Sequence, residues 1–199
     1  MRTLILFAHP SFEKSRIHAA LVSKVPGDGS VTFRDLYQRY PDFDIDVEAE
    51  QKLLVDHDLI VLQHPLYWYS VPPLMKQWID LVLEHGWAYG RDGRALEGKT
   101  LMCLVSAGGT SSAYRSEGHN KYTVREFLRP IEQTAKLCRM NYWAPYVVHG
   151  THRLGEPEIQ RHAERYRALL DRLATGRIDP DEATAADELN RIVEDGGRR

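Results

Sequence analysis

The sequence predicts a doubly wound α/β fold with a parallel central sheet, because strand-like and helix-like segments alternate along most of the chain. Five short apolar runs are typical of strands buried on both faces, and five longer segments have helical spacing. With 199 residues, the chain can bury one large core without disulfides. We therefore expect one domain over residues 1–177, followed by a polar tail over residues 178–199.

Local signals support each element. The strand at residues 59–63 is an unbroken apolar run that His64-Pro65 ends, since proline donates no ladder hydrogen bond. Ser15 and Asp46 are suited to cap two helices, and Pro72-Pro73 suits the first turn of a third. The expected strands cover residues 3–8, 31–36, 59–63, 100–107 and 146–149, and the expected helices cover residues 15–25, 47–56, 72–84, 124–137 and 156–173.

The alternation also predicts the strand order. Right-handed crossovers make such a sheet parallel, and a flavodoxin-like order 2-1-3-4-5 is the leading choice, with a Rossmann order as the alternative. The turn after the first strand lacks the G-x-G-x-x-G pattern of dinucleotide-binding Rossmann folds. Residues 86–98, rich in glycine, predict a hairpin-like excursion, and the acidic tail predicts one short helix at most, with partial disorder.

Composition argues against several classes of partner. The net charge is −2, so nothing indicates a nucleic-acid-binding surface. Cys103 and Cys138 lie far apart in the sequence, which predicts no disulfide framework and fits a reducing cytoplasm. No segment approaches about twenty uninterrupted apolar residues, so we expect any membrane association to be peripheral.

The loop after the third strand is the most informative stretch. Leu66, Tyr67, Trp68 and Tyr69 form a large apolar surface beside backbone amides. In an open parallel sheet, ligands bind at the carboxyl edge, where this loop opens. The pattern therefore indicates a site for a flat ring, although the same aromatic residues are compatible with ordinary core packing.

The loop after the first strand offers the chemistry of an anion site. It contains His9, Ser11, Ser15 and Arg16, and Ser15 is placed as the N-cap of the following helix. Free amides at a helix N-terminus, with hydroxyl groups and a nearby cation, are groups that bind phosphate. The alternative is that Ser15 only caps the helix.

A glycine-rich loop follows the fourth strand. Gly108 and Gly109, after Ser106 and Ala107, allow the backbone to approach a ligand closely. Under the expected topology, this loop opens at the same sheet edge as the other two. A phosphate site, a flat apolar face and a close backbone edge together fit flavin mononucleotide (FMN).

Several segments resemble the flavodoxin-like NAD(P)H:quinone oxidoreductase family, and most closely the ancillary subunits of bacterial glutathione-regulated potassium efflux systems. The resemblance covers residues 3–173 and leaves the tail outside it. Its specific segments are Ala8-His9-Pro10, Leu36-Tyr37, Tyr40-Pro41-Asp42-Phe43, Gln63-His64-Pro65-Leu66-Tyr67 with Tyr69-Ser70, Trp78-Ile79-Asp80 and Gly86-Trp87-Ala88-Tyr89-Gly90. Looser matches are Ser112-Ala113-Tyr114-Arg115, Leu128-Arg129-Pro130 and Cys138-Arg139-Met140.

The resemblance implies three groups of residues that contact the flavin. The phosphate and ribityl chain would be held by one group, the ring lined by the second, and the opposite ring edge closed by the third. The family usually has asparagine where this chain has His18. The groups are His9, Ser15, Arg16, Ile17 and His18; Leu66, Tyr67, Trp68 and Tyr69; and Ser106, Ala107, Gly108 and Gly109.

Catalytic residues follow from the same resemblance. Tyr114 resembles a tyrosine that faces the flavin and assists proton movement beside a histidine six residues later. Here that position is Asn120 and His119 lies one place earlier, so Tyr114 and His119 are the candidates, and the alternative is that both are solvated loop residues. We expect no metal site, because His149 and His152 lack further ligands at suitable spacing.

The function expected from this resemblance is ping-pong transfer of a hydride from NADPH or NADH, through bound FMN or FAD, to a quinone. It also implies a homodimer and a regulatory partnership with a membrane potassium efflux antiporter. The helix at residues 124–137, with Arg125, Arg129 and Arg139, is the candidate docking face, and the alternative is that these arginines only form exposed pairs with Glu126 and Glu132. The alternative is a non-catalytic regulatory module of a potassium efflux transporter, with the flavin structural or absent.

Overall fold

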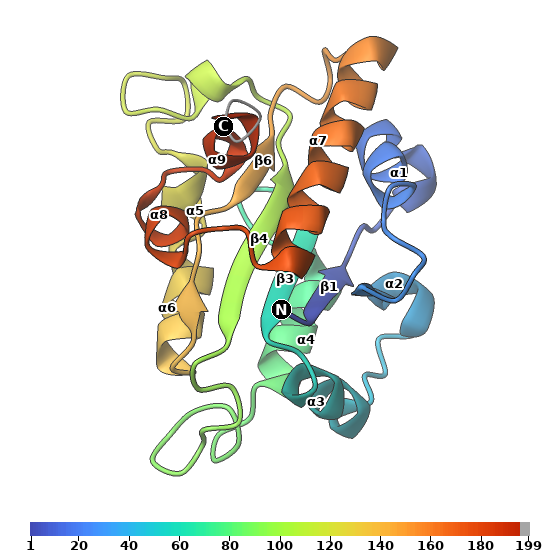
Figure 1. Cartoon of the computed structure of the whole chain (residues 1–199). Helices are drawn as coiled ribbons and strands as arrows, with labels where there is room; N and C mark the ends of the chain where they lie inside the picture. Colours follow the sequence, from blue (N-terminus) through green and yellow to red (C-terminus); the bar gives the residue numbers. More distant parts are fainter. Residues whose placement is uncertain (196–199) are drawn as a thin grey trace.

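The computed structural model describes residues 1–195 and has a parallel sheet with helices on both faces (Figure 1). The strands are β1 (Thr3–Phe7), β2 (Val31–Asp35), β3 (Leu59–Pro65), β4 (Thr100–Ser106), β5 (Asn141–Tyr142) and β6 (Tyr146–Val148). Their order is β2-β1-β3-β4-β5, all parallel, with β6 also paired to β4. This confirms the flavodoxin-like order and excludes the Rossmann alternative.

The last position of the sheet is divided between two short strands. β5 pairs with the first residues of β4, and β6 pairs with its last residues, Leu104 to Ser106. The sequence predicts only the second of these strands. Pro145 lies between them and has no N–H group for a ladder hydrogen bond, which explains why pairing is interrupted there.

The two faces of the sheet carry separate apolar cores. One face is covered by α1 (Arg16–Val22), α7 (Glu156–Thr175), α8 (Pro180–Ala185) and α9 (Asn190–Asp195). The other is covered by α2 (Leu36–Arg39), α3 (Val47–Val55), α4 (Pro73–Val82), α5 (Val124–Phe127) and α6 (Arg129–Leu137). Each fully buried Leu, Ile or Val side chain contributes about 1.5–3 kcal/mol, so the central strands are the rigid base of the fold.

Two expected elements differ in the structure. The predicted helix at residues 124–137 is two helices, with Leu128 at ψ 6° and Pro130 near the start of the second. Residues 86–98 form a turn-rich loop with no strand pair, and the Arg139 guanidinium donates to the carbonyls of Gly90 and Gly93 at 2.9 and 2.7 Å. A side chain from elsewhere therefore fixes this loop.

The C-terminal segment is more structured than the sequence predicts. Instead of one short helix at most, it forms α8 and α9, and both pack on the face that carries α7. Ile178, Ala183, Leu189 and Val193 are buried there. Composition alone misses this packing, because a few widely spaced apolar residues are enough to anchor an otherwise polar segment. The expectation of disorder at residues 196–199 lies outside the described residues.

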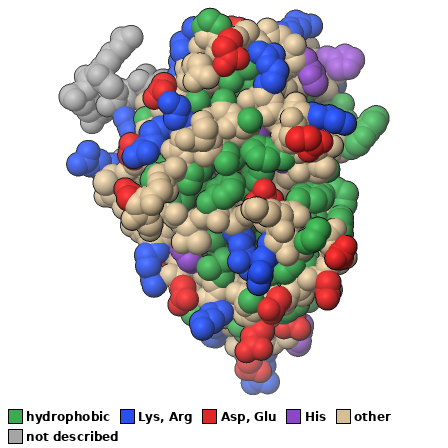
Figure 2. Space-filling view, turned by 90° about the vertical axis from the view of Figure 1, so that its right-hand side faces the viewer, with side chains coloured by type: hydrophobic (Ala, Val, Ile, Leu, Met, Phe, Trp, Pro, Cys, Tyr) green, Lys and Arg blue, Asp and Glu red, His purple; other side chains and the backbone are tan. Residues whose placement is uncertain are grey.

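The surface carries charges of both signs in mixture. Figure 2 shows the face on which α1 and α2 lie, with apolar side chains gathered across its middle and acidic ones toward its lower end. No large patch made of positively charged side chains alone is visible on this face. Among residues 1–195, no helix has the length and apolar character needed to cross a bilayer.

Candidate active site

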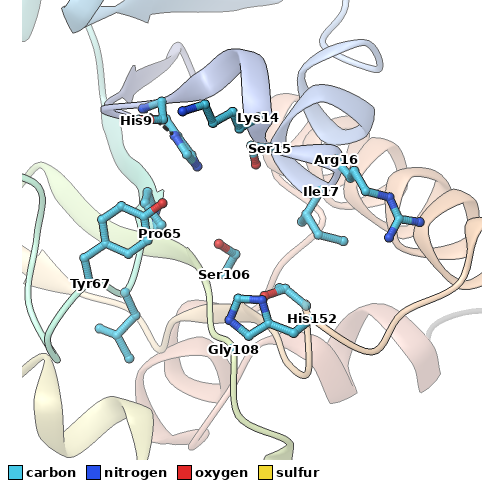
Figure 3. Close-up of a pocket in the computed structure, with 13 residues that line it drawn as sticks. His9, Lys14, Ser15, Arg16, Ile17, Pro65, Tyr67, Ser106, Gly108 and His152 are labelled. Atoms are coloured by element: carbon cyan, nitrogen blue, oxygen red, sulfur yellow. Dashed lines mark hydrogen bonds between the residues drawn. The ribbon is translucent and has the colours of Figure 1, made fainter.

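The carboxyl ends of β1, β3 and β4 open into one cavity of about 560 Å³ (Figure 3). Three of its walls come from the three loops that the sequence singles out. A fourth wall comes from the loop after β6, and this wall is absent from the prediction. The lining residues are His9, Ser11, Lys14, Ser15, Arg16, Ile17, Pro65, Leu66, Tyr67, Ser106, Gly108, Thr151 and His152.

The loop after β1 forms the polar, cationic wall. Ser15 caps α1, and its hydroxyl oxygen accepts the backbone N–H of His18 at 3.1 Å. The backbone N–H of Ser11 donates to His9 Nδ1 at 3.2 Å, so in neutral His9 the hydrogen is on Nε2. Burial lowers the pKa of His9, which keeps the imidazole neutral. Together with Lys14, this wall suits an anionic group, whereas the Arg16 guanidinium turns to the Leu154 carbonyl at 3.3 Å and to Glu156 at 3.8 Å (Figure 3).

A buried polar chain lies directly below the cavity. The Tyr166 hydroxyl donates to Gln63 Oε1 at 2.9 Å, the Gln63 amide lies 3.5 Å from His18 Nδ1, and His18 Nε2 lies 2.9 Å from Ser106 Oγ. Burial holds the pKa of His18 well below its usual range, so the ring is neutral. When His18 Nε2 donates, the Ser106 hydroxyl keeps its own hydrogen for a ligand in the cavity.

His18 therefore acts from beneath the site. Its side chain is fully buried and does not line the cavity, unlike the expectation of a direct flavin contact. Ala107 is likewise buried behind the lining. His18 lies in the first turn of α1 and Ala107 directly after β4, but the direction of each side chain depends on packing.

The aromatic loop turns through an unusual backbone conformation. Trp68 and Tyr69 both have positive φ, 48° and 62°, between the bridged residues Tyr67 and Ser70. Left-handed geometry costs a non-glycine residue roughly 1–2 kcal/mol. Trp68 is also 94% exposed, so no core contact offsets this cost. Such strain typically concentrates where a loop grips a ligand or a partner.

The glycine-rich loop leaves no room for side chains. A Cβ at Gly108 would lie 2.6 Å from His152 Nε2, and one at Gly109 would lie 3.0 Å from the Tyr114 ring. The loop after β6 holds these glycines in place, since the Gly150 N–H donates to the Gly109 carbonyl at 2.8 Å. Because both residues lack a side chain, the backbone that follows β4 can come close to a ligand at this edge.

Two shallower hollows, of about 340 and 350 Å³, adjoin the cavity at Gly108. Tyr114 lines both, and burial raises the pKa of its hydroxyl. His119 lines one hollow only, whereas Asn120 accepts a hydrogen bond from the Tyr69 hydroxyl at 3.2 Å. The structure thus brings Tyr114 and His119 to hollows beside the cavity, where Tyr69 and Gly109 line the same hollow as both of them.

Sequence reasoning missed the residues that follow β6. Thr151 and His152 line the cavity, and Arg153 lines one of the hollows. A signal for them existed, because His149-Gly150-Thr151-His152 follows the last expected strand and so falls at the same sheet edge. The described residues contain no cluster of histidine, cysteine or acidic side chains that could hold a metal.

These features fit FMN. The cationic end with His9, Lys14 and Ser15 matches a phosphate, and the Tyr67 and Trp68 end matches a flat ring. Gly108 and Gly109 line the hollow beside Trp68 and Tyr69, so a ring edge placed there would meet backbone and no side chain.

The comparison with protein families agrees with this geometry. Residues 1–170 match the family Flavodoxin_2, described as a flavodoxin-like fold. The chain belongs to this family. A relative named as an uncharacterized NAD(P)H oxidoreductase YrkL, from Bacillus subtilis, is 42% identical over 83% of this flavodoxin-like chain and 95% of its own length. The glutathione-regulated potassium-efflux system ancillary protein KefG of Cronobacter sakazakii is 42% identical over 88% of this chain and 96% of its own.

Solved structures give the same picture. General stress protein 14 of Treponema denticola, in complex with FMN, is 43% identical with a TM-score of 0.82, over 87% of this chain and 99% of that one. An NADPH-quinone reductase from P. pentosaceus is 36% identical with a TM-score of 0.77, over 85% and 98%. A chain described as a thermophilic tryptophan halogenase, from Streptomycin violaceusniger, is 47% identical with a TM-score of 0.80, over 82% and 95%.

Proposed function

We propose that this flavodoxin-like protein is an FMN-dependent NAD(P)H:quinone oxidoreductase. One observation carries the proposal. A polar, cationic loop, a strained aromatic turn and a glycine-rich loop lie together at the carboxyl end of the sheet. Relatives named as an NAD(P)H oxidoreductase and an NADPH-quinone reductase, and one structure that holds FMN, support the choice of chemistry.

The residues divide into binding and chemical roles. His9, Lys14, Ser15 and the amides that begin α1 would hold the phosphate, while Ser106 would donate to the ribityl chain or the ring. FMN, when bound, supplies a ring that takes a hydride from a nicotinamide and passes reducing equivalents to a quinone.

Tyr114 would supply the proton that the reaction needs. Reduction of a quinone by NAD(P)H consumes one hydride and one proton, and gives NAD(P)⁺ and a hydroquinone. The raised pKa keeps the Tyr114 hydroxyl protonated, so it can donate at the ring end of the site. His119 lines the hollow where the quinone oxygen would lie and is the second candidate proton donor.

A homodimer remains part of the proposal. Tyr67, Trp68, Tyr69 and Tyr122 are all at least 45% exposed, and large aromatic side chains are enriched in the cores of protein interfaces. Since Trp68 and Tyr69 also line a hollow beside Tyr114, a second copy seated there would cover the open side of the ring site.

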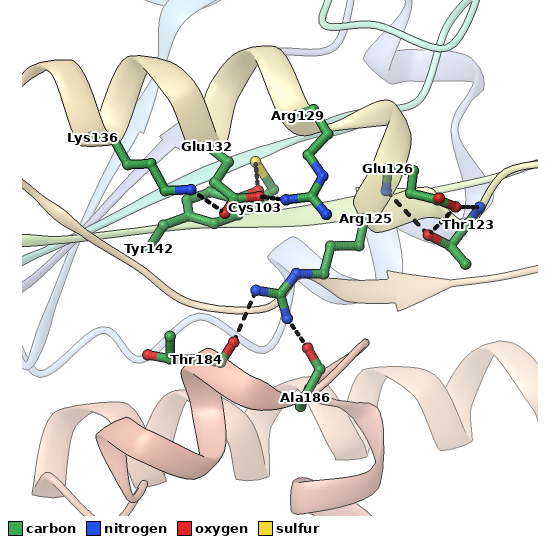
Figure 4. Close-up of polar contacts among 10 residues, drawn as sticks. All are labelled: Cys103, Thr123, Arg125, Glu126, Arg129, Glu132, Lys136, Tyr142, Thr184 and Ala186. Carbon is green, nitrogen blue, oxygen red and sulfur yellow. Dashed lines mark hydrogen bonds and ion pairs between the residues drawn. The ribbon is translucent and has the colours of Figure 1, made fainter.

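A potassium efflux system is the proposed partner class, because the KefG relative is named as its ancillary protein. Binding to such a membrane protein would also place this chain at the inner membrane face. The predicted docking arginines need correction, however. Arg125 donates to the carbonyls of Thr184 and Ala186, and Arg129 pairs with Glu132 at 2.9 Å (Figure 4). Arg139 is engaged with the 86–98 loop, so Arg125 and Arg139 stabilise this chain and do not await a partner.

Two other functions are tested by the same preparation. A non-catalytic regulatory module would show no turnover with any quinone, whether its flavin is structural or absent. The halogenase description of one similar chain raises oxidative halogenation of tryptophan, which an assay with tryptophan, chloride, NAD(P)H and dioxygen in place of quinone would detect.

The test of the proposal is reconstitution followed by steady-state kinetics. The purified protein is incubated with FMN or FAD and desalted, and the bound flavin is measured by its absorbance. Initial rates with NADPH and a benzoquinone should give parallel double-reciprocal lines, because both substrates use one site in turn. Colourless protein after both reconstitutions would overturn the proposal, and intersecting lines would overturn the shared site.

A further inference from the structure

The C-terminal segment places a carboxylate against a histidine behind the candidate active site. His149 Nε2 lies 2.8 Å from Glu188 Oε1, and the two side chains are 14% and 28% exposed. Glu188 belongs to the connection between α8 and α9, beyond the residues that match the family. The pair is therefore a feature that the family match does not cover.

Several bonds fix this connection on the sheet edge. The Asn190 side chain accepts from the Val147 N–H at 2.9 Å and donates to the Val147 carbonyl at 2.7 Å, as a neighbouring strand would. The backbone N–H of Leu189 donates to Pro145 at 2.9 Å. Arg125 holds the preceding turn through the carbonyls of Thr184 and Ala186 (Figure 4). Glu188 is thus presented from a fixed backbone.

His149 lies next to the candidate proton donor. Its ring centroid is 5.7 Å from that of Tyr114, at an interplanar angle of 44°. Its Nδ1 atom is buried and has no hydrogen-bond partner within residues 1–195. The next residue, Gly150, donates to the Gly109 carbonyl, so His149 stands directly behind the glycine edge and the Tyr114 ring.

We propose that Glu188 and His149 are positioning residues for Tyr114, an inference that rests on the proposed quinone reductase function. Glu188 accepts the Nε2–H of His149 and so fixes the imidazole in one orientation beside the Tyr114 ring. The fixed imidazole holds Tyr114 so that its hydroxyl gives one proton to a quinone oxygen, and one proton from solvent then restores that hydroxyl. The C-terminal segment is then a working part of the active site.

The variant Glu188→Gln tests this idea, because glutamine offers the Nε2–H a neutral and weaker acceptor in place of the carboxylate and so holds the imidazole less firmly. The control is Glu182→Gln, the same change at an exposed position of the same segment, with no side-chain bond within residues 1–195. We expect kcat for quinone reduction to fall by about tenfold or more in Glu188→Gln, with the KM for NADPH changed by less than about twofold. Glu188→Asp should recover part of the loss, and the control should match the wild type.

A second readout does not depend on turnover. The Nε2–H proton of His149, bonded to a carboxylate, should give a downfield NMR signal in the wild type that Glu188→Gln moves or removes. Adding FMN should shift this signal if His149 and Glu188 are coupled to the flavin site. If the pair only anchors the C-terminal segment, the signal should not move. Thermal melting of each FMN-loaded variant separates loss of fold from loss of chemistry.

The outcomes are distinct. No turnover in the wild type would contradict the proposed function itself. Turnover in the wild type together with an unchanged kcat in Glu188→Gln, or a His149 signal blind to FMN, would overturn this inference alone. If Glu188→Gln does not fold, His149→Asn carries the same test, and an unchanged kcat in that variant would overturn the inference.

Discussion

Individual residues at the sheet edge determine whether a flavin can approach the backbone. Gly108 faces the cavity and would carry a Cβ 2.6 Å from His152. Gly27, in contrast, has no atom within 4 Å of its Cβ position and lies in a surface loop. The two glycines therefore separate the effect of close approach from the general effect of replacing glycine.

Gly108→Val should weaken FMN binding. Overpacking costs about 1–3 kcal/mol, which corresponds to roughly a five- to 150-fold rise in the dissociation constant if the site absorbs all of it. Quenching of FMN fluorescence during titration measures this constant. Gly27→Val should bind FMN as the wild type does, and equal affinity in the Gly108 variant would show that the flavin lies elsewhere.

Tyr114→Phe should separate binding from chemistry. The ring remains, so FMN affinity should hold, but the hydroxyl that donates a proton is lost. We expect kcat for quinone reduction to fall by roughly a hundred- to ten-thousandfold, the range typical of acid-base assistance. A rate equal to that of the wild type would favour the alternative that Tyr114 is a solvated loop residue.

Residue roles were only partly predictable from the sequence. Loop membership was accessible, because strand ends and glycines mark it, and most predicted binding residues do line the cavity or its hollows. The burial of the His18 side chain depends on tertiary packing, and so do the contacts of His152 with Gly108 and of His149 with Tyr114. A linear pattern carries no information about such contacts.

At the scale of elements, apolar periodicity predicted the strands well and the irregular segments poorly. The runs that form β1, β3 and β4 are buried on both faces, so they form an unmistakable signal. The division between β5 and β6 and the break before α6 both fall next to a proline. The packing of α8 and α9 rests on single apolar contacts and on Asn190, which no periodicity reveals.

Asn190→Leu should loosen the C-terminal segment. It removes both hydrogen bonds to Val147 and leaves a part-buried N–H and carbonyl without their partners. We expect a loss of about 1–3 kcal/mol in the free energy of unfolding, measured by urea denaturation. Glu182→Leu, at an exposed site of the same segment, is the control. An unchanged free energy in Asn190→Leu would mean that α9 adds nothing to the fold.

At the scale of the whole molecule, buried histidines link stability to pH. Burial lowers the pKa of His64 to about 4 and holds that of His18 well below its ordinary value of 6.5. Below pH 6.5 the unfolded chain therefore binds more protons than the folded one, and the free energy of unfolding falls as the pH drops toward about 4. The slope contributed by each histidine approaches about 1.4 kcal/mol per pH unit.

Denaturation at a series of pH values checks this expectation. His64→Gln should show a shallower loss of stability between pH 6.5 and about 4 than the wild type. His85→Gln, at an exposed position, should follow the wild-type curve. Parallel curves for the wild type and His64→Gln would mean that His64 is not kept neutral by the fold.

The central claim is that the whole sheet edge works as a flavin-dependent reductase. Anaerobic stopped-flow absorbance of the FMN-loaded protein tests it most directly. NADPH or NADH alone should bleach the yellow colour in a single mixing step, and a quinone added afterwards should restore it at a rate that accounts for steady-state turnover. Protein that stays yellow with both nicotinamides, or bleached protein that a quinone does not re-oxidise, would contradict the account.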